Sequence, residues 1–295
     1  MWSLTRRALG RLAAAVGIAP ALPPAAPAAP HGIAIGLQLY TVGADLARDV
    51  AGTLARVAAI GYREVETAGL AGKSASAMAA ALRRSGLTCR SAHVDIAALR
   101  ADLPARLAEA RTLGASYVVV PFPMLRPGRS GDVVQAMALD DWRWLADELN
   151  RTGALVAKQG MALAYHNHNL EFRRYGDVLA YDELLRRTDP ALVTFEMDVG
   201  WVTAAGADPL AYLTAHPGRF PLLHLKDVLP GGTPNASMQI QTTEVGSGII
   251  DWKGLLTVAR GAGTGLAYVE QEPPFARPPL ESAALSWRHL DRVRL

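Results

Sequence analysis

The sequence lacks the features that would indicate a disulfide-linked protein, a structural zinc site or a nucleic-acid-binding protein. Its 295 residues include a single cysteine, Cys89, so no internal disulfide can form, and no CxxC pair is present to hold a structural zinc ion. A lone cysteine in a β-prone run is expected to be a buried strand residue. No cluster of lysine and arginine and no nucleic-acid-binding motif occurs, so we expect no nucleic acid as a partner.

Residues 1–30 differ in composition from the rest of the chain. Arg6, Arg7 and Arg11 lie before and within an alanine-rich apolar stretch, and a Pro/Ala-rich segment with small residues suited to cleavage follows. TRRALGR resembles a twin-arginine signal, so we predict use of the twin-arginine export machinery and a periplasmic or secreted location. The apolar stretch is too short and too often broken by Pro and Gly to span a bilayer, so we expect no stable membrane insertion after cleavage. A basic N-terminus without a targeting role is the alternative.

This leader also accounts for the excess positive charge. The sequence has 30 Lys and Arg against 27 Asp and Glu, a formal charge of +3, and the leader contributes three arginines and no acid. Residues 31–295 are therefore close to neutral and favour no polyanionic partner. Half of the residues are hydrophobic and 19% are charged, which is typical of a globular chain with a large core.

From residue 33 onward, short β-rich runs alternate with segments of helical periodicity, several of which end at a glycine (Gly61, Gly86, Gly114 and Gly160). The β-rich runs cover residues 33–41, 63–68, 87–95, 117–123, 161–169, 193–201, 221–228 and 265–273.

Eight such units predict parallel strands that close into a single-domain (β/α)8 TIM barrel over residues 31–295. An open doubly wound sheet is the competing arrangement, but no glycine-rich phosphate fingerprint follows the first strand. The longest predicted loops, residues 124–138 and 229–248, lie at the C-terminal end of the barrel, where barrel enzymes place their active sites. We expect these loops to set specificity.

The last four β-rich runs each carry two titratable residues spaced two apart near their C-terminal ends. Side chains two apart on a strand share a face, so each pair is expected to point into the barrel. The pairs are His166 and His168, Glu196 and Asp198, His224 and Lys226, and Glu270 and Glu272. Buried charges must pair, hold a cation or contact a polar ligand. Mixed carboxylate and imidazole donors favour one divalent ion, Mn²⁺, Zn²⁺ or Co²⁺, over Ca²⁺.

The blocks YHNHNLEF, EMDVGWVTAAGADPLAYL, HLKD, VGSGIIDW and YVEQE resemble, in this order, the sugar phosphate isomerase/epimerase superfamily of xylose isomerase-like barrels. That resemblance implies one divalent ion held by a Glu, Asp, His, Glu set on the last four strands. Asp198, His224 and Glu270 match three of these positions, and His166 stands where the family carries its first glutamate. The family's two ligand glutamates also exchange the substrate proton, so His168, Lys226 or Glu272 is expected to supply the second acid/base group.

The resemblance further implies a metal-dependent isomerase, epimerase or lyase that acts on a small-molecule sugar or keto-sugar, with a 3-keto-glycoside as one option. In the expected reaction Glu270 takes a proton beside the carbonyl, Lys226 stabilises the enediolate, and His168 faces the substrate. The expected substrate-binding residues are Tyr40, Glu66, His93, Trp201 and Glu272. For His93 taken alone a satisfied core position is the more common interpretation, and for Trp201 a core position is at least as good an interpretation as contact with the substrate.

Three other functions remain open at this point. The first is a non-catalytic periplasmic sugar-binding barrel with a vestigial metal site. The second is a nuclease of the endonuclease IV type, which would need a basic face and ligands for three zinc ions. The third is a metal-free enzyme in which Lys226 forms a Schiff base. Both a monomer and a homo-oligomer are compatible with the sequence.

The segment VGSGIIDW has two interpretations. The amides of Gly246 and Gly248 suit a phosphate or sugar oxygen. Alternatively, the glycines form a turn into a helix that is capped by Asp251, and this second interpretation is favoured.

Overall fold

The computed structural model describes residues 32–295, so the predicted export leader lies outside the described residues. Within that range, every helix is too short or too polar to cross a lipid bilayer.

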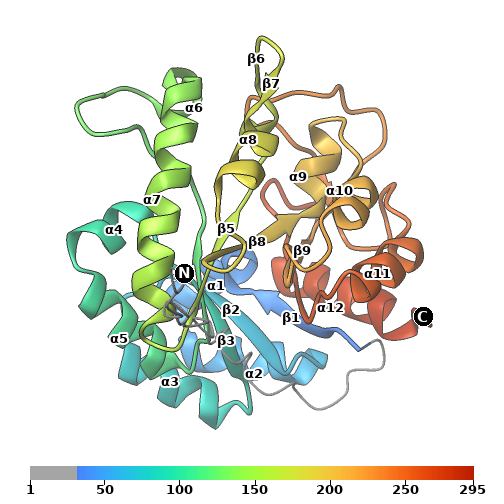
Figure 1. The fold of residues 1–295 in the computed structure, drawn as a ribbon. Coiled ribbons are helices and arrows are strands. Elements are labelled where there is room, and N and C mark those ends of the chain that lie inside the picture. Colours follow the sequence, from blue (N-terminus) through green and yellow to red (C-terminus); the bar gives the residue numbers. More distant parts are fainter. Residues whose placement is uncertain (1–31) are drawn as a thin grey trace, which may run out of the picture.

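Eight parallel strands close into a barrel with helices around its outside, which confirms the predicted TIM-barrel fold (Figure 1). The strands pair in the order β1-β12-β9-β8-β5-β4-β3-β2. They are β1 (Ala34–Gln38), β2 (Glu64–Ala68), β3 (Thr88–His93), β4 (Tyr117–Val120), β5 (Ala162–His166), β8 (Val193–Asp198), β9 (Leu222–Leu225) and β12 (Leu266–Val269). Two small antiparallel pairs stand outside the barrel: β6 (Arg174–Tyr175) with β7 (Val178–Leu179), and β10 (Asp227–Val228) with β11 (Thr242–Thr243).

Helices connect the strands and cover the barrel. They are α1 (Gly43–Arg48), α2 (Val50–Ile60), α3 (Ala75–Arg84), α4 (Ile96–Ala101), α5 (Leu103–Leu113), α6 (Val133–Ala136), α7 (Leu139–Ala157), α8 (Ala180–Arg187), α9 (Val199–Ala204), α10 (Pro209–Ala215), α11 (Trp252–Gly261) and α12 (Pro279–Arg292), with 3-10 turns η1 (Leu39–Val42) and η2 (Leu170–Phe172).

The core has an outer and an inner part. Outward-facing strand residues such as Phe195 and Leu223 pack with the helices in the larger cluster. Inside the barrel, a smaller apolar cluster fills the end opposite the C-terminal ends of the strands. Its residues are Tyr117, Val119, Ala164, Leu222, Leu266 and Tyr268. Tyr268 has room because its neighbour on β1 is Gly36, where a Cβ atom would lie 2.6 Å from the tyrosine ring. This apolar plug closes the barrel below its polar end.

The predicted helix ends are confirmed at four glycines, but one predicted helix is divided. Gly61, Gly86, Gly114 and Gly160 all have positive φ, the conformation that ends a helix at low cost when the residue is glycine. The helical pattern of residues 45–61 forms two helices, because Asp49 adopts an extended conformation and its side chain accepts a hydrogen bond from Gly52 N. The local cap therefore overrides the continuous apolar periodicity.

Most of the predicted strands were too long at their C-terminal ends. The sixth run was expected to continue to Trp201, but β8 ends at Asp198, whose Oδ1 accepts a hydrogen bond from Trp201 N at 2.8 Å and starts α9. Likewise β5 ends at His166, so His168 lies in the turn that follows. Capping of a new element satisfies the backbone where strand pairing stops, and the alternation rule no longer holds beyond that point.

The VGSGIIDW segment wraps around a buried carboxylate. Asp227 Oδ2 accepts hydrogen bonds from Gly246 N (2.8 Å), Gly248 N (3.1 Å) and Trp252 Nε1 (2.8 Å). These glycine amides are therefore engaged by the protein itself rather than presented to an external anion. Asp251 caps α11 through Gly254 N, which confirms the favoured interpretation.

Replacement of Asp227 should destabilise the fold strongly. Asp227→Ala leaves several buried donors without an acceptor, and we expect a loss of roughly 3–5 kcal/mol in the free energy of unfolding. Asp251→Ala removes only an exposed helix cap and should cost about 1 kcal/mol. Urea denaturation followed by circular dichroism measures both values. Equal effects of the two substitutions would contradict the central role of Asp227.

Candidate active site

Strand register brings the polar ends of the last four strands together inside the barrel. His166 is level with Glu196 on the neighbouring strand, and Asp198 is level with His224. Each of the four residues His166, Asp198, His224 and Glu270 offers one ligand atom, and these atoms lie within 4.8 Å of one another. All four residues are buried. The structure thus gathers the whole set expected from the sequence to bind a metal.

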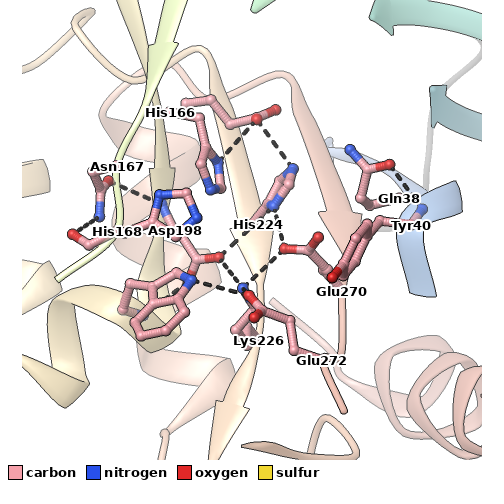
Figure 2. A network of polar contacts seen from close by, with 12 residues as sticks. Gln38, Tyr40, His166, Asn167, His168, Asp198, His224, Lys226, Glu270 and Glu272 are labelled. Atoms are coloured by element: carbon pink, nitrogen blue, oxygen red, sulfur yellow. Dashed lines mark hydrogen bonds and ion pairs between the residues drawn. The ribbon is translucent and has the colours of Figure 1, made fainter. Parts of the chain in front are cut away.

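Lys226 lies at the centre of the carboxylates in this cluster (Figure 2). Its Nζ is 2.8 Å from Asp198 Oδ2, 2.9 Å from Glu270 Oε2 and 2.5 Å from Glu272 Oε1. The Lys226 side chain is fully buried, and an ammonium group there is stable only with such partners. Burial lowers the pKa of Lys226, but the negative charges of Asp198, Glu270 and Glu272 raise it by more than burial lowers it. The net pKa is therefore well above the ordinary value.

His224 has a carboxylate on each side of its ring. Nδ1 faces Glu270 Oε2 at 2.9 Å, and Nε2 faces Glu66 Oε2 at 2.7 Å and Glu196 Oε2 at 3.0 Å. A histidine that binds a metal through one nitrogen usually donates its other N–H to a carboxylate. His224 is therefore arranged to present Nδ1 toward Asp198 and Glu270 while Glu66 and Glu196 orient the ring.

A second group of ligands overlaps the first. His93, His166, Glu196 and His224 also bring one ligand atom each within 4.8 Å of one another. His93 Nε2 lies 2.9 Å from Glu196 Oε2, and His166 Nδ1 lies 3.2 Å from the same oxygen. Because the two groups share His166 and His224, they form one continuous cluster rather than two separate sites.

The charges within the cluster differ from residue to residue. Burial lowers the pKa of His93, but Glu66 and Glu196 raise it to about 10, so this ring is cationic at neutral pH. Burial and the nearby charge of Lys226 lower the pKa of His168 to about 3, so that ring is neutral. Burial raises the pKa of Asp198 to about 6 against the opposing effects of Lys226 and His224.

These residues suit a divalent cation. The two nitrogen and two carboxylate donors are the mixed ligand set that Mn²⁺, Zn²⁺ and Co²⁺ accept. Glu196 Oε1 is buried and has no hydrogen-bond partner among residues 32–295, so the cluster has unused acceptor capacity. Carboxylates also outnumber the one ammonium group at this end of the barrel: Glu66, Glu196, Asp198, Glu270 and Glu272 surround Lys226 and the histidines.

The turn after β5 is held rigidly beside the cluster. Asn167 Oδ1 accepts hydrogen bonds from Asp198 N and Tyr181 Oη, both at 3.1 Å. Glu171 Oε2 accepts one from His168 N at 3.0 Å, and Glu171 Oε1 accepts one from Tyr165 Oη at 2.5 Å. These contacts place His168 with its ring 4.9 Å from that of His166 and 5.3 Å from that of Trp201, measured between centroids.

A cavity of about 720 Å³ opens above the cluster. Tyr40, His93 and Glu272 line it, as do His166, His168 and Glu270. Tyr40 is 53% exposed at the edge of the barrel.

Glu66 and Trp201 lie behind the cavity lining rather than along it. Glu66 is fully buried and bound to His224 and Gln38, and Trp201 Nε1 donates to Glu272 Oε1 at 3.1 Å. Both residues position others in the cluster. Lys226 Nζ also lies 5.1 Å from the Trp201 ring centroid.

Sequence reasoning gave no role to several residues of the site. Glu196 was expected to point inward but was not assigned as a ligand, because the family resemblance favoured Asp198 on that strand. Gln38 is the polar residue in the middle of the apolar segment GLQLY. Its Nε2 donates a hydrogen bond to Glu66 Oε2 at 2.7 Å. Asn167 and Glu171 were visible in YHNHNLEF, but only the tertiary structure shows what they hold in place.

The site and the fold together define a TIM barrel with a buried candidate metal centre at the C-terminal ends of its strands. The chain belongs to the xylose isomerase-like TIM barrel family, whose model matches residues 54–292. This family assignment confirms the superfamily resemblance predicted from the sequence.

Individual relatives cover the chain to different extents. A sugar phosphate isomerase/epimerase from Parabacteroides distasonis has a solved structure with a TM-score of 0.72 and 25% identity, covering 88% of this chain and 94% of its own. An inosose dehydratase from Geobacillus thermodenitrificans is 32% identical over 152 residues, which are 47% of this chain and 50% of that protein. An inosose dehydratase from Lacticaseibacillus casei is 27% identical over 170 residues, 52% of this chain and 54% of that protein. The chain thus spans about half the length of the curated relatives it matches.

The buried Glu171 should leave a measurable pH signature on stability. Burial raises its pKa to about 7, so the folded protein keeps a proton that the unfolded chain releases above about pH 4.5. Protonation of Glu171 therefore stabilises the folded protein at low pH. As the pH rises toward 7, this contribution to the free energy of unfolding falls by about 3 kcal/mol. Glu171→Gln should remove this dependence, which denaturation of both proteins between pH 5 and 8 would show.

Glu183→Gln is the control of opposite sign. Burial raises the pKa of Glu183, but Arg143 and Arg186 lower it by more than burial raises it. The net pKa of Glu183 therefore lies below the ordinary value. The stability that Glu183 contributes is lost as the pH falls. A difference between wild type and Glu171→Gln that is constant with pH would show that Glu171 is ionised in the fold throughout.

Proposed function

We propose that the protein is a metal-dependent, sugar-modifying enzyme that removes a proton next to the carbonyl group of a keto-sugar and forms an enediolate. The observation that carries this proposal is the buried cluster of His166, Asp198, His224, Glu270 and Lys226, of which His166 and Glu270 line the cavity. Proton abstraction beside a carbonyl needs a base and a positive group near the carbonyl oxygen, and this cluster supplies both.

The comparisons support the same class of chemistry. Relatives that match about half of this chain are named inosose dehydratases, and loss of water beside a carbonyl group can begin with loss of the adjacent proton. The structure with 25% identity is named a sugar phosphate isomerase/epimerase, and isomerisation can begin with the same step. Return of the proton gives an isomer or epimer, whereas loss of a β-substituent makes the enzyme a lyase.

Each residue has a role that follows from its position. Glu270 lines the cavity and accepts the proton from the substrate carbon. Lys226 remains an ammonium group that holds Asp198, Glu270 and Glu272, and its positive charge stabilises the negative charge that develops on the substrate oxygen. His168 lines the cavity as a neutral imidazole and donates a hydrogen bond to a substrate oxygen or to the leaving group, and the proton that returns to the intermediate or to the leaving group is the one that Glu270 accepted. A divalent ion bound by His166, Asp198, His224 and Glu270 would supply Lewis-acid stabilisation of the developing charge.

One observation favours a second candidate, a non-catalytic sugar-binding barrel. The Lys226 ammonium already pairs with Asp198 and Glu270, two of the expected metal ligands, and so balances part of their charge without a cation. The same ion pairs argue against a Schiff base, because a nucleophilic lysine must be neutral and these carboxylates keep Lys226 protonated.

Metal content is the first test of the proposed enzyme. The purified protein should contain about one divalent ion per chain, measured by inductively coupled plasma mass spectrometry, because four donors converge on one point. Asp198→Ala and His166→Ala should each lose the ion, whereas Asp208→Ala, which removes an exposed helix cap, should retain it. A wild-type protein that takes up neither Mn²⁺ nor Zn²⁺ would favour the binding barrel.

Lys226→Gln should separate metal binding from catalysis. We expect solvent-deuterium exchange into keto-sugars to fall by roughly 10²–10³-fold, because the positive charge beside the developing oxyanion is lost. Metal content should stay near that of the wild type, since none of the four donors is changed. Nuclear magnetic resonance of the exchanged carbon measures the rate. Trapping of a keto-sugar on Lys226 by borohydride, with exchange retained in chelator-treated protein, would instead support the Schiff-base route.

A further inference from the structure

The cavity above the cluster has two chemically different parts. Its floor carries imidazoles and carboxylates of the cluster, whereas the rest of the lining combines apolar residues, among them Leu70, Val94, Phe122 and Met238, with the charged residues Asp95, Arg106 and Glu109. A volume of about 720 Å³ lies in the upper part of the range for small-molecule sites. A sugar ring, which carries polar groups around its edge, fits the floor but gains little from the apolar residues of the lining.

Met238 stands out among these apolar residues because of its backbone. It has a φ of 62°, and only Ala71 shares a positive φ with it among the non-glycine residues of 32–295. A side chain larger than hydrogen is strained in this conformation, which persists only where surrounding contacts impose it. Such contacts tend to occur where a residue is held for a ligand.

Asn169 supplies those contacts. Its side chain is fully buried; Oδ1 accepts a hydrogen bond from Met238 N at 2.9 Å, and Nδ2 donates to Asn235 Oδ1 at 2.8 Å. A further bond from Asn169 Nδ2 reaches Gln239 O at 3.3 Å. Asn169 lies three residues after His166, so the segment 235–239 is fastened directly to the turn that carries His168. The position of Met238 is therefore tied to that of the polar cluster.

We propose that Met238, held by Asn169, is a specificity-determining residue, and that the substrate is a sugar derivative with an apolar alkyl or aryl substituent. The sugar part of this inference rests on the function proposed above. The ring occupies the polar floor beside His93, His168 and Glu270, and the substituent lies along the apolar wall that includes Phe122 and Met238. Methionine suits this role because its flexible thioether packs against substituents of varied shape.

Equilibrium binding tests this inference without turnover. Isothermal titration of the metal-supplied protein with methyl and phenyl β-D-glucoside should give roughly tenfold tighter binding of the phenyl compound. Met238→Ala should lower the phenyl affinity roughly five- to tenfold and leave the methyl affinity within about twofold. Asn169→Ala should reduce the phenyl preference in the same way, because Met238 loses its support.

Met124→Ala is the matched control. It makes the same truncation at a partly buried methionine in the loop after β4, outside the residues that line the cavity, and should leave the phenyl preference unchanged. An equal effect of both truncations would overturn the role of Met238. Equal wild-type affinities for the two glucosides, or no binding of either, would overturn the inference about the substituent.

The inference and the proposed function fail in different experiments. Deuterium exchange into keto-sugars without any phenyl preference removes the inference and leaves the proposed function in place. A phenyl preference that depends on Met238, without exchange into any keto-sugar, removes the proposed catalysis and leaves a barrel that binds substituted sugars.

Discussion

The polar end of this barrel depends on the ion pairs of Lys226. Asp198 at the end of β8 and Glu270 and Glu272 just after β12 point toward one another, and without a cation between them their mutual repulsion and lost hydration would disfavour the closed barrel. The Lys226 ammonium group lies within 3 Å of all three carboxylates and offsets part of their negative charge. His224, with carboxylates facing both ring nitrogens, extends that balance to Glu66 and Glu196.

A rigid surround makes this charge arrangement specific. The lower half of the barrel is filled by an apolar plug, so the polar residues cannot sink deeper, and Gly200 of α9 allows the backbone to pass close to Lys226. A Cβ atom at Gly200 would lie 2.6 Å from Lys226 O. Asn167 ties the turn after β5 to the backbone of Asp198. Each group in the cluster is thus set by a neighbour that itself cannot move far.

The loops contribute a different property from the strands. Strand ends carry the titratable groups, whose geometry suits proton transfer on a carbonyl compound and is consistent with membership of the xylose isomerase-like family. The segment containing Met238 comes from a long loop and adds an apolar wall beside them. Titratable groups at the strand ends combined with variable loops allow one barrel fold to serve different chemistries.

The sequence by itself determined the barrel, because eight β-rich runs alternating with helical segments have few other stable arrangements, and glycines mark the helix ends. It also indicated which segments meet at the site, since the polar pairs in YHNHNLEF, EMDVGW, HLKD and YVEQE all lie at or just beyond the C-terminal ends of neighbouring barrel strands. Only the tertiary structure decided where each strand stops, because a helix cap such as that of Asp198 depends on local backbone geometry rather than alternation. It alone decided that Glu196 contacts three histidines, that Glu66 lies behind the cavity lining, and that Asn169 reaches Met238. These contacts link residues tens to more than a hundred positions apart, and no local pattern in the chain encodes such distances.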